Sequence, residues 1–567
     1  MKTIGFSTRS THFNSTVHFL ILPFLMMALP AKANFIAANS TNYTSYLSGL
    51  TAGDTLFLTA GNYTKQLNLN NRMGTASDPI VIMGEGVNTV FLGNACCNTV
   101  NLTNCAYLVI RDFKLDGQNI NYIDGVKAGG GGNNFAHHIT LENLLIVNHG
   151  GNISGDNQTV GISTKCAAWN WTIRQCVIIG AGTGIYLGNS DSTCPFVSGL
   201  IENNLVINTR GYNMQVKAQK DNVRQIFAAT SNDSQTTIIR YNVWSKDSGS
   251  TMIGEGDGSR PCLLMDHFPS TGFGSHDRYE VYGNFFYNNP TEALMQVTAN
   301  AAIYNNIFVN HVAPSGYRTI VINDHDGFPP RDINVFHNTV LSSSPSGGIG
   351  LFNPNSGYGQ YCYANAVFSN GTTISGFQPS KSLDNIVSTY ANANAYILSP
   401  STTLSLLDVF PVAGQLEGAL TDNTPFTDFT DFNIDFNGNS YDWTYRGAYS
   451  GSGINPGWAL QLDTMPTPHG TITGFHDPSG ENDFLGILYP NPASNDIRIT
   501  LNAVQKTFAK IELSDLEGKI HRIVFEGNLE SGKQQIHGNV SDLQNGFYFL
   551  LVQTEFGLVS KKVLVQR

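Results

Sequence analysis

Two charged residues, Lys217 and Glu255, follow asparagines at the same distance in successive stretches of the chain. Lys217 lies 13 residues after Asn204, and Glu255 lies 13 residues after Asn242. If the two stretches stack as neighbouring coils, their side chains lie about 4.8 Å apart, the spacing of adjacent strands. They could form an ordinary surface ion pair, worth under about 1 kcal/mol. They could also form an open site in which a lysine exchanges a proton with a bound substrate.

Further cations are expected around Lys217. Neighbouring positive charges favour the neutral form of a lysine, which can accept a proton, and they also attract an acidic substrate. We therefore expect Lys217 to act as a catalytic base, with the opposite charge of Glu255 working against this effect. The predicted substrate-binding cations are Lys220, Arg224, Arg240 and Arg260.

Carboxylates and histidines complete this candidate site. Glu255, Asp257 and Asp266 offer the oxygen ligands that Ca²⁺ prefers, and the bound ion could in turn hold a substrate carboxylate. His267 and His325 are secondary candidates for acid or base. A lone histidine is more often structural, so each of these two also has a structural interpretation.

Aromatic side chains on loops or outward rows are expected to contact a glycan, because sugar rings stack on flat apolar surfaces. Most of the 33 Phe residues are better explained as interior side chains. The candidates for sugar contact are Trp244, Phe268, Phe273, Tyr317 and Tyr358. Among them, Trp244 is the predicted substrate-binding residue.

A repeated phrase positions these residues. Between about residues 100 and 370, an apolar residue, two variable residues and a polar residue precede an apolar strand. Such a repeat predicts a solenoid in which stacked coils bury one another's inward faces, and stacked asparagines at a corner would satisfy backbone groups of adjacent coils. The polar residue falls at Asp112, Asn143, Gln175, Asn204, Asn242, Asn284, Asn306, Asn338 and Asn365, with separations of 22 to 42 residues.

The two longest coils are consecutive and carry the extra segments 218–235 and 257–277, which should flank one groove. Side chains alternate along the strand that follows each polar residue. This alternation predicts that Lys217, Glu255 and Asn323 lie on an outward row. The residues expected to point inward in these strands are Met214, Met252, Leu294 and Ile320.

The composition excludes several classes of protein. The chain has 567 residues, and its 31 basic and 42 acidic side chains give a net charge of −11. Nucleic acid is not an expected partner, because binding a polyanion requires a basic surface. Hydrophobic residues make up 41% of the chain, enough for a large core, and the 57 glycines suit many tight turns. Long stretches of helical periodicity are absent, so we expect an all-β protein.

With these features the chain resembles the right-handed parallel β-helix proteins, which include many secreted polysaccharide lyases. The resemblance covers about residues 35–450. Segment 52–86, with its GTASDPIVI phrase, is similar to the first coils of such proteins, and segment 431–453 to the tail that caps their last coil. In similar lyases that cleave chondroitin or alginate, a carboxylate-binding Arg follows on the coil after the lysine. Here Glu255 occupies that place, and neither Arg240 nor Arg260 falls at the matching phase.

Both ends of the chain predict export. Residues 1–33 have two early basic residues, an apolar run at 19–29 and a small-x-small cleavage site at 31–33, as a secretory signal peptide has. That run is too short for a membrane-spanning helix, and no other segment qualifies. The C-terminal YPNP, SDLEGK, NGFYFLLV and final KK phrases resemble the sorting domain of the type IX secretion system. This resemblance implies export across the outer membrane, and the alternative is a carbohydrate-binding or other sandwich module.

Cysteine usage predicts one or two disulfides in the first half of the chain, without fixing their pairing. The cysteines that crowd there are Cys96, Cys97, Cys105, Cys166, Cys176 and Cys194.

We expect a signal peptide at 1–33, a right-handed parallel β-helix at 34–453, a linker at 454–484 and a β-sandwich sorting domain at 485–567. The expected function is that of a monomeric secreted or cell-surface enzyme that cleaves a uronic-acid glycan by β-elimination, with Ca²⁺ as its metal. Its expected partners are the polysaccharide and the type IX machinery. One alternative is a non-catalytic adhesin or glycan-binding solenoid. The other is a glycoside hydrolase that uses paired carboxylates from among Asp257, Asp266, Asp324 and Asp326.

Overall fold

The computed structural model describes residues 33–131, 133–150, 159–232, 234–246, 259–467, 485–489, 493–503, 506–514, 519–554 and 557–565. The chain divides into two compact units, Met1–Gly470 and Thr471–Arg567. Each unit is described by itself below.

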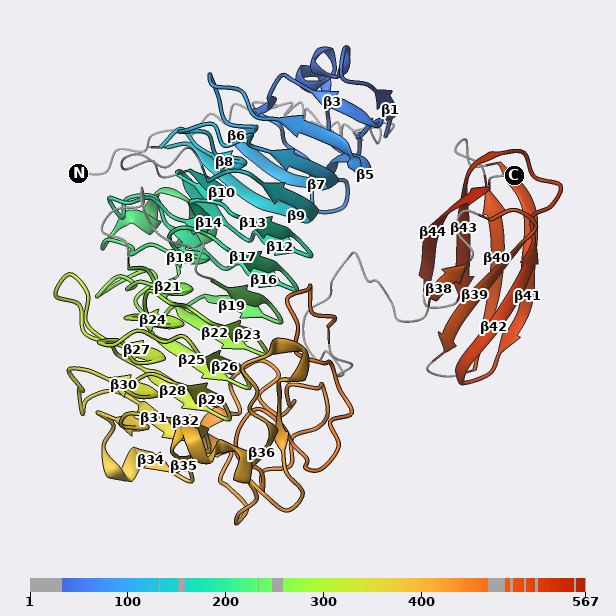
Figure 1. Cartoon of the computed structure of the whole chain (residues 1–567). Helices are drawn as coiled ribbons and strands as arrows, with labels where there is room; N and C mark the ends of the chain where they lie inside the picture. The colour runs from blue at the N-terminus through green and yellow to red at the C-terminus, as the bar shows by residue number, and fades with distance from the viewer. Residues whose placement is uncertain are drawn as a thin grey trace, which may run out of the picture. The chain divides into compact units, whose positions relative to one another are not determined.

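The first unit is a right-handed parallel β-helix built from stacked coils (Figure 1). In the regular part, each coil gives two short strands to a 24-stranded sheet, turns, and gives a third strand to an 11-stranded sheet. In these two sheets the strands pair in parallel from one coil to the next, as Arg174 with Glu202 and Glu202 with Arg240 show. The all-β solenoid predicted from the repeat is confirmed.

The 11-stranded sheet carries the candidate site. Its strands are β4 (Leu67–Asn70), β6 (Val100–Thr103), β8 (Val126–Ala128), β10 (Val160–Thr164), β14 (Thr183–Leu187), β18 (Met214–Val216), β21 (Leu263–Met265), β24 (Met295–Val297), β27 (Ile320–Ile322), β30 (Ile349–Leu351) and β33 (Ile374–Ser375).

The 24-stranded sheet supplies the other two sides of the coils. Its strands are β1 (Phe35–Ala38), β2 (Thr55–Leu58), β3 (Gly61–Tyr63), β5 (Ile80–Leu92), β7 (Cys105–Asp116), β9 (Phe135–Val147), β11 (Ala167–Trp169), β12 (Thr172–Arg174), β13 (Val177–Ile179), β15 (Phe196–Val197), β16 (Leu200–Glu202), β17 (Leu205–Ile207), β19 (Thr236–Arg240), β20 (Val243–Ser245), β22 (Arg278–Tyr282), β23 (Phe285–Tyr287), β25 (Ala301–Tyr304), β26 (Ile307–Asn310), β28 (Ile333–Phe336), β29 (Thr339–Ser342), β31 (Gln360–Tyr363), β32 (Ala366–Ser369), β34 (Ser382–Leu383) and β35 (Ile386–Ser388).

The described helices are short 3-10 turns. They are η1 (Tyr43–Ser45), η2 (Leu47–Gly49), η3 (Val223–Ile226), η4 (Ala228–Thr230), η5 (Pro379–Lys381), η6 (Tyr390–Ala395), η7 (Leu404–Leu406) and η8 (Thr424–Phe426). Among the described residues, no helix is long and apolar enough to cross a membrane.

An asparagine ladder stabilises the corner between the first two strands of each coil from Asn204 onward. The Asn204 Nδ2 donates to Asn242 Oδ1 at 2.9 Å, and the same bond recurs from Asn242 to Asn284 at 2.9 Å. It continues through Asn306, Asn338 and Asn365 to Asn385, one coil beyond the predicted repeat. The ladder satisfies buried backbone groups at a corner that would otherwise leave them unpaired.

The first three predicted ladder positions are wrong by one residue. Strand pairing places Gln175 opposite Asn203 and Cys176 opposite Asn204, because Arg174 pairs with Glu202. Gln175 and Asn203 share a left-handed backbone, with φ of 53° and 55°. Cys176 instead occupies the ladder position and donates its backbone N–H to Asn204 Oδ1 at 2.9 Å. Polar residues that suit the left-handed corner were thus mistaken for the ladder itself.

The predicted strand register on the 11-stranded sheet also needs correction. Strand β18 pairs with β21, with Met214 opposite Leu263 and Val216 opposite Met265. The prediction had paired Met214 with Met252, in a segment that lies outside the described residues. On the next coil Met295 and Val297 continue the inward row.

Residues 389–467 form a layer along the side of the β-helix instead of a cap on its last coil. This layer includes β36 (Ile397–Ser399) and β37 (Asp408–Pro411), and it lies alongside the strands labelled β26 and β29 (Figure 1). Phe426 stacks on Phe336 with ring centroids 4.1 Å apart, and Asn305 Nδ2 donates to Ile434 O at 2.6 Å. Leu460 and Met465 are buried in the same cluster, so the first part of the predicted linker at 454–484 belongs to the β-helix unit.

The second unit is an antiparallel β-sandwich of seven strands, as the C-terminal pattern predicts. One sheet has the order β38-β39-β42 and the other β41-β40-β43-β44. The strands are β38 (Leu485–Tyr489), β39 (Asp496–Ala503), β40 (Thr507–Ser514), β41 (Ile520–Leu529), β42 (Gly532–Asn539), β43 (Gly546–Thr554) and β44 (Gly557–Val565).

One disulfide is present among the described residues, and it joins the neighbours Cys96 and Cys97. This agrees with the lower end of the predicted range. The other six cysteines are buried thiols: Cys105, Cys166, Cys176, Cys194, Cys262 and Cys362.

Candidate active site

The candidate site lies on the outward face of the 11-stranded sheet, where strands β18 and β21 end. Lys217 directly follows β18, and Asp266 directly follows β21. The Asp266 N–H donates to Val216 O at 3.1 Å, which continues the pairing of the two strands. Lys217 therefore stands beside Asp266 on adjacent coils, about 4.8 Å apart along the stack. The carboxylate that the strand pairing places beside Lys217 is Asp266. Glu255, which was predicted there, lies outside the described residues.

His325 joins this pair from a loop two coils further along. Its Nδ1 lies 3.1 Å from Asp266 Oδ1, and Asp326 lies 3.8 Å away on the exposed side. The hydrogen bond to Asp266 raises the pKa of His325 above its ordinary value, while the positive charge of nearby Lys217 acts against this shift. His325 is therefore biased toward the imidazolium form next to Lys217.

Asp266 is almost completely buried, with 1% of its surface exposed. Burial alone would raise its pKa, but the hydrogen bond and charge of His325 lower it below the ordinary value. The His267 N–H also donates to Asp266 Oδ1 at 2.8 Å. Asp266 is thus an ionised, fixed partner that orients His325.

His267 supports this group and does not present itself to solvent. Its ring stacks on Phe328 at 3.7 Å between centroids, and burial lowers its pKa. The His267 O accepts the Gln219 N–H at 3.0 Å, which ties the segment after Lys217 to the next coil. This geometry favours the structural interpretation of His267 over its predicted role as acid or base.

A second polar group lies where β24 enters the sheet, and sequence reasoning missed it. Glu292 accepts a hydrogen bond from Gln296 Nε2, and the cations Lys246 and Arg260 lie nearby. Burial raises the pKa of Glu292 to about 7 and lowers the pKa of Lys246 to about 8. Glu292 belongs to a short turn, whereas the sequence signal for a site was the two oversized segments 218–235 and 257–277.

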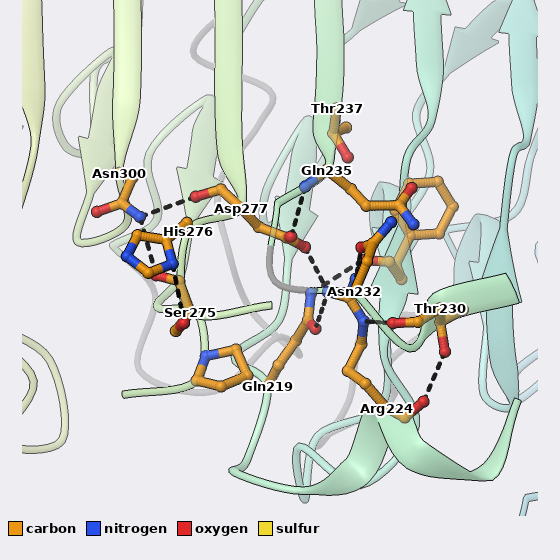
Figure 2. Close-up of polar contacts among 12 residues, drawn as sticks. Gln219, Arg224, Thr230, Asn232, Gln235, Thr237, Ser275, His276, Asp277 and Asn300 are labelled. Carbon is orange, nitrogen blue, oxygen red and sulfur yellow. Dashed lines mark hydrogen bonds and ion pairs between the residues drawn. The ribbon is translucent and has the colours of Figure 1, made fainter. Parts of the chain in front are cut away.

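Arg224 is an interior residue and does not bind substrate from the surface as predicted. Figure 2 shows its guanidinium among polar side chains of two coils. It forms an ion pair with Asp277, and the side chains of the two residues are 0% and 3% exposed. Its Nε also donates to Thr230 O at 2.9 Å, while Gln235 N–H donates to Asp277 Oδ1 at 2.7 Å. The pair fastens segment 218–235 to the next coil.

Arg240 and Trp244 also fail as substrate-binding residues. Arg240 lies on the other sheet, in β19, and pairs with Glu202 at 2.7 Å and with Asp431 of the side layer at 3.3 Å. The Trp244 side chain is 0% exposed and belongs to the interior core. Arg240 had been expected around Lys217 and Trp244 on a loop or outward row, but both lie in strands of the 24-stranded sheet, β19 and β20.

The other residues predicted to bind substrate differ in how far they are exposed. Lys220 is exposed at the start of segment 218–235, and Arg260 is half-buried over the ring of Tyr212 at 5.6 Å. Phe268 is buried and stacks on Tyr279 at 4.6 Å, which removes it from a sugar-binding surface. Of the aromatic residues predicted to contact a sugar, those that keep some exposed surface are Phe273, Tyr317 and Tyr358.

Only one of the three predicted Ca²⁺ ligands can be placed. Glu255 and Asp257 lie outside the described residues, and Asp266 is already bound to His325. Within the described part of the chain, no group of three or more His, Cys, Asp or Glu side chains gathers as a metal site. The described residues alone therefore do not form a Ca²⁺ site, and the ion remains a prediction.

Comparison with known proteins identifies the family of the C-terminal unit. Residues 487–566 match the family model described as the secretion system C-terminal sorting domain. The chain carries a type IX sorting domain. It is therefore a secreted or surface protein, as the YPNP and NGFYFLLV phrases predict. A search of curated proteins found no match.

Several solved structures are similar to parts of this chain at low sequence identity. A family PL6 alginate lyase, AlyGC, is 12% identical with a TM-score of 0.42, over 62% of this chain and 51% of that one, so the chain spans about half of its length. The PL6 polysaccharide lyase Pedsa3628 from Pseudopedobacter saltans is 12% identical with a TM-score of 0.36, over 63% and 93% of the two chains. Pectate lyase Pel9A is 13% identical with a TM-score of 0.33, over 73% and 96%.

Proposed function

We propose that this chain is a secreted or surface polysaccharide lyase that cleaves a uronic-acid glycan by β-elimination at Lys217. The observation that carries the proposal is the grouping of Lys217, Asp266 and His325 on one outward face of the β-helix. In this proposal Lys217 is the proton acceptor and the oriented imidazolium of His325 is the cation beside it. Those are two of the groups that β-elimination from a uronic acid requires.

In the proposed reaction Lys217 takes the C5 proton of the uronic acid. The resulting negative charge develops next to the substrate carboxylate, so a fixed cation lowers the barrier. His325 supplies that charge, because Asp266 holds its Nδ1 at 3.1 Å and favours its protonated form. The electrons of the broken C–H bond form the C4–C5 double bond as the glycosidic C4–O bond breaks.

Ca²⁺ is part of this proposal as a second means of neutralising the substrate carboxylate. When bound, the ion would supply electrostatic stabilisation near Asp266. Removal of the ion by a chelator tests whether glycan cleavage requires Ca²⁺.

The test is a screen of the purified protein on alginate, pectate and glycosaminoglycans, with and without EDTA. A lyase produces an unsaturated sugar that absorbs in the ultraviolet, and that absorbance is the expected result. New reducing ends without this absorbance would indicate a hydrolase. Binding without cleavage of any glycan would indicate an adhesin or binding solenoid, and either result contradicts the proposal.

A further inference from the structure

Glu292 is held in place in the turn that leads into strand β24 of the 11-stranded sheet. It lies in the turn 288–294, between β23 and β24. Asn289 organises this turn, because its Oδ1 accepts the N–H groups of Thr291 at 3.0 Å and Glu292 at 3.3 Å. The Asn289 Nδ2 also donates to Arg260 O on the preceding coil at 2.9 Å. The turn is thereby fixed both internally and to its neighbour.

The Glu292 carboxyl is tied to the outward face of the sheet by its hydrogen bond with the Gln296 side chain. Gln296 lies between the inward residues Met295 and Val297, so its side chain points outward, and its Nε2 donates to Glu292 Oε1. Gln215 occupies the same outward row two coils earlier. Its side-chain Nε2 is buried and has no hydrogen-bond partner in the structure as described. An unsatisfied amide on this row is a donor that a bound sugar hydroxyl could satisfy.

The two polar groups lie at opposite ends of the same strands. Glu292 and Arg260 lie where the strands enter the sheet, whereas Lys217 and Asp266 lie where they leave it. Strands β18, β21 and β24 each have three residues. At about 3.3 Å per residue the groups lie about 10 Å apart along the strands, and β18 and β24 lie two coils, about 10 Å, apart across them, with Gln215 and Gln296 between the groups. A glycan bound obliquely over these strands would have one group on each side.

The charges that face Glu292 come from the coil before it. They are Lys246, whose Nζ donates to Arg260 O at 3.0 Å, and the Arg260 guanidinium, with the neutral thiol of Cys262 nearby. Burial raises the pKa of Glu292 to about 7 despite both cations. A carboxyl that still carries a proton near neutral pH can give it to a leaving oxygen.

We propose that Glu292 is the proton donor to the glycosidic oxygen, and that the glycan lies across β18, β21 and β24 between Glu292 and Lys217. This inference rests on the proposed lyase function. The C5–H bond breaks with transfer of the proton to Lys217, the C4–C5 double bond forms, and the C4–O bond breaks. The leaving oxygen takes the proton of Glu292, which is then restored from water.

The experiment compares wild-type protein with Glu292→Gln, Glu292→Asp and the control Glu417→Gln, an exposed carboxylate in the same unit. Glu292→Gln removes the proton donor but keeps a partner for Gln296. We expect kcat to fall by about 100-fold or more, the typical contribution of a general acid. KM should change little. The part of the alkaline fall in rate that comes from Glu292 should disappear, leaving only the fall set by deprotonation of His325. Glu292→Asp should recover part of kcat, and Glu417→Gln should match the wild type.

The outcomes separate the two proposals. If the wild type yields unsaturated product and Glu292→Gln retains its kcat and its alkaline limb, the assignment of Glu292 is wrong while the lyase function stands. If the wild type yields no unsaturated product from any glycan, both proposals fail. Thermal melting of each variant checks folding. If Glu292→Gln does not fold, Glu292→Asp takes its place in the test. The assignment is then refuted if Glu292→Asp has the kcat of the wild type and the same fall in rate at alkaline pH.

Discussion

Asp277→Ala should destabilise the β-helix unit strongly, because it leaves the buried Arg224 without its ion-pair partner. The Arg224 side chain is 0% exposed, so water cannot replace the lost carboxylate. Its remaining hydrogen bonds run to Thr230 O at 2.9 Å and, at 3.4 Å each, to Gln219 Oε1 and Asn232 Oδ1, none of which carries a charge. The Gln235 N–H would lose its acceptor as well. Removing one partner of a buried pair costs about 3–5 kcal/mol.

Equilibrium unfolding in urea, followed by tryptophan fluorescence, measures this loss. The matched control is Lys114→Ala, because Lys114 and Asp116 form an ion pair whose side chains are 26% and 18% exposed. It should cost less than about 1 kcal/mol. The double change Arg224→Met with Asp277→Leu removes both charges, so most of the loss should be recovered. A cost below about 1 kcal/mol for Asp277→Ala, or a double variant worse than either single variant, would refute this reasoning.

Three further changes test other parts of the structure. Asn306→Ala should lower the unfolding free energy by at least about 2 kcal/mol, because the N–H and Nδ2 of Asn284 lose their buried acceptor; chemical unfolding measures this. The raised pKa of His325 means that its pairing with Asp266 stabilises the fold below the ordinary histidine pKa of about 6.5 and is lost as pH rises through the folded-state value. The stability difference between wild type and His325→Gln should therefore shrink from mildly acidic to alkaline pH, and a difference that grows would contradict the assigned pair. EDTA should abolish glycan cleavage and added Ca²⁺ should restore it, whereas unchanged activity in EDTA would remove the metal from the mechanism.

The coil architecture could be predicted from sequence because it depends on local alternation and on one recurring asparagine. From Asn204 to Asn365 each predicted ladder residue is buried and bonded to the next. The three earlier positions failed because Gln175 and its equivalents suit a left-handed corner, and one residue separates that corner from the ladder. A sequence pattern alone does not distinguish two adjacent polar positions.

The site was harder to predict because the distance from the ladder to the third strand varies between coils. After β17 the chain reaches β18 through residues 208–213, but after β20 it reaches β21 only through 246–262. Counting 13 residues from Asn242 therefore stops within the connection and gives Glu255 instead of Asp266. Glu255 lies outside the described residues, and the strand pairing places Asp266 beside Lys217.

Cleavage by the Lys217→Ala variant tests the central claim most directly. The comparison uses the glycan that the wild type cleaves, and the control is Lys65→Ala, which removes an exposed lysine near the N-terminal end of the β-helix. We expect unsaturated product from the wild type and from Lys65→Ala, and none above background from a folded Lys217→Ala protein. Product formation by Lys217→Ala at the wild-type rate would show that the reaction takes place elsewhere.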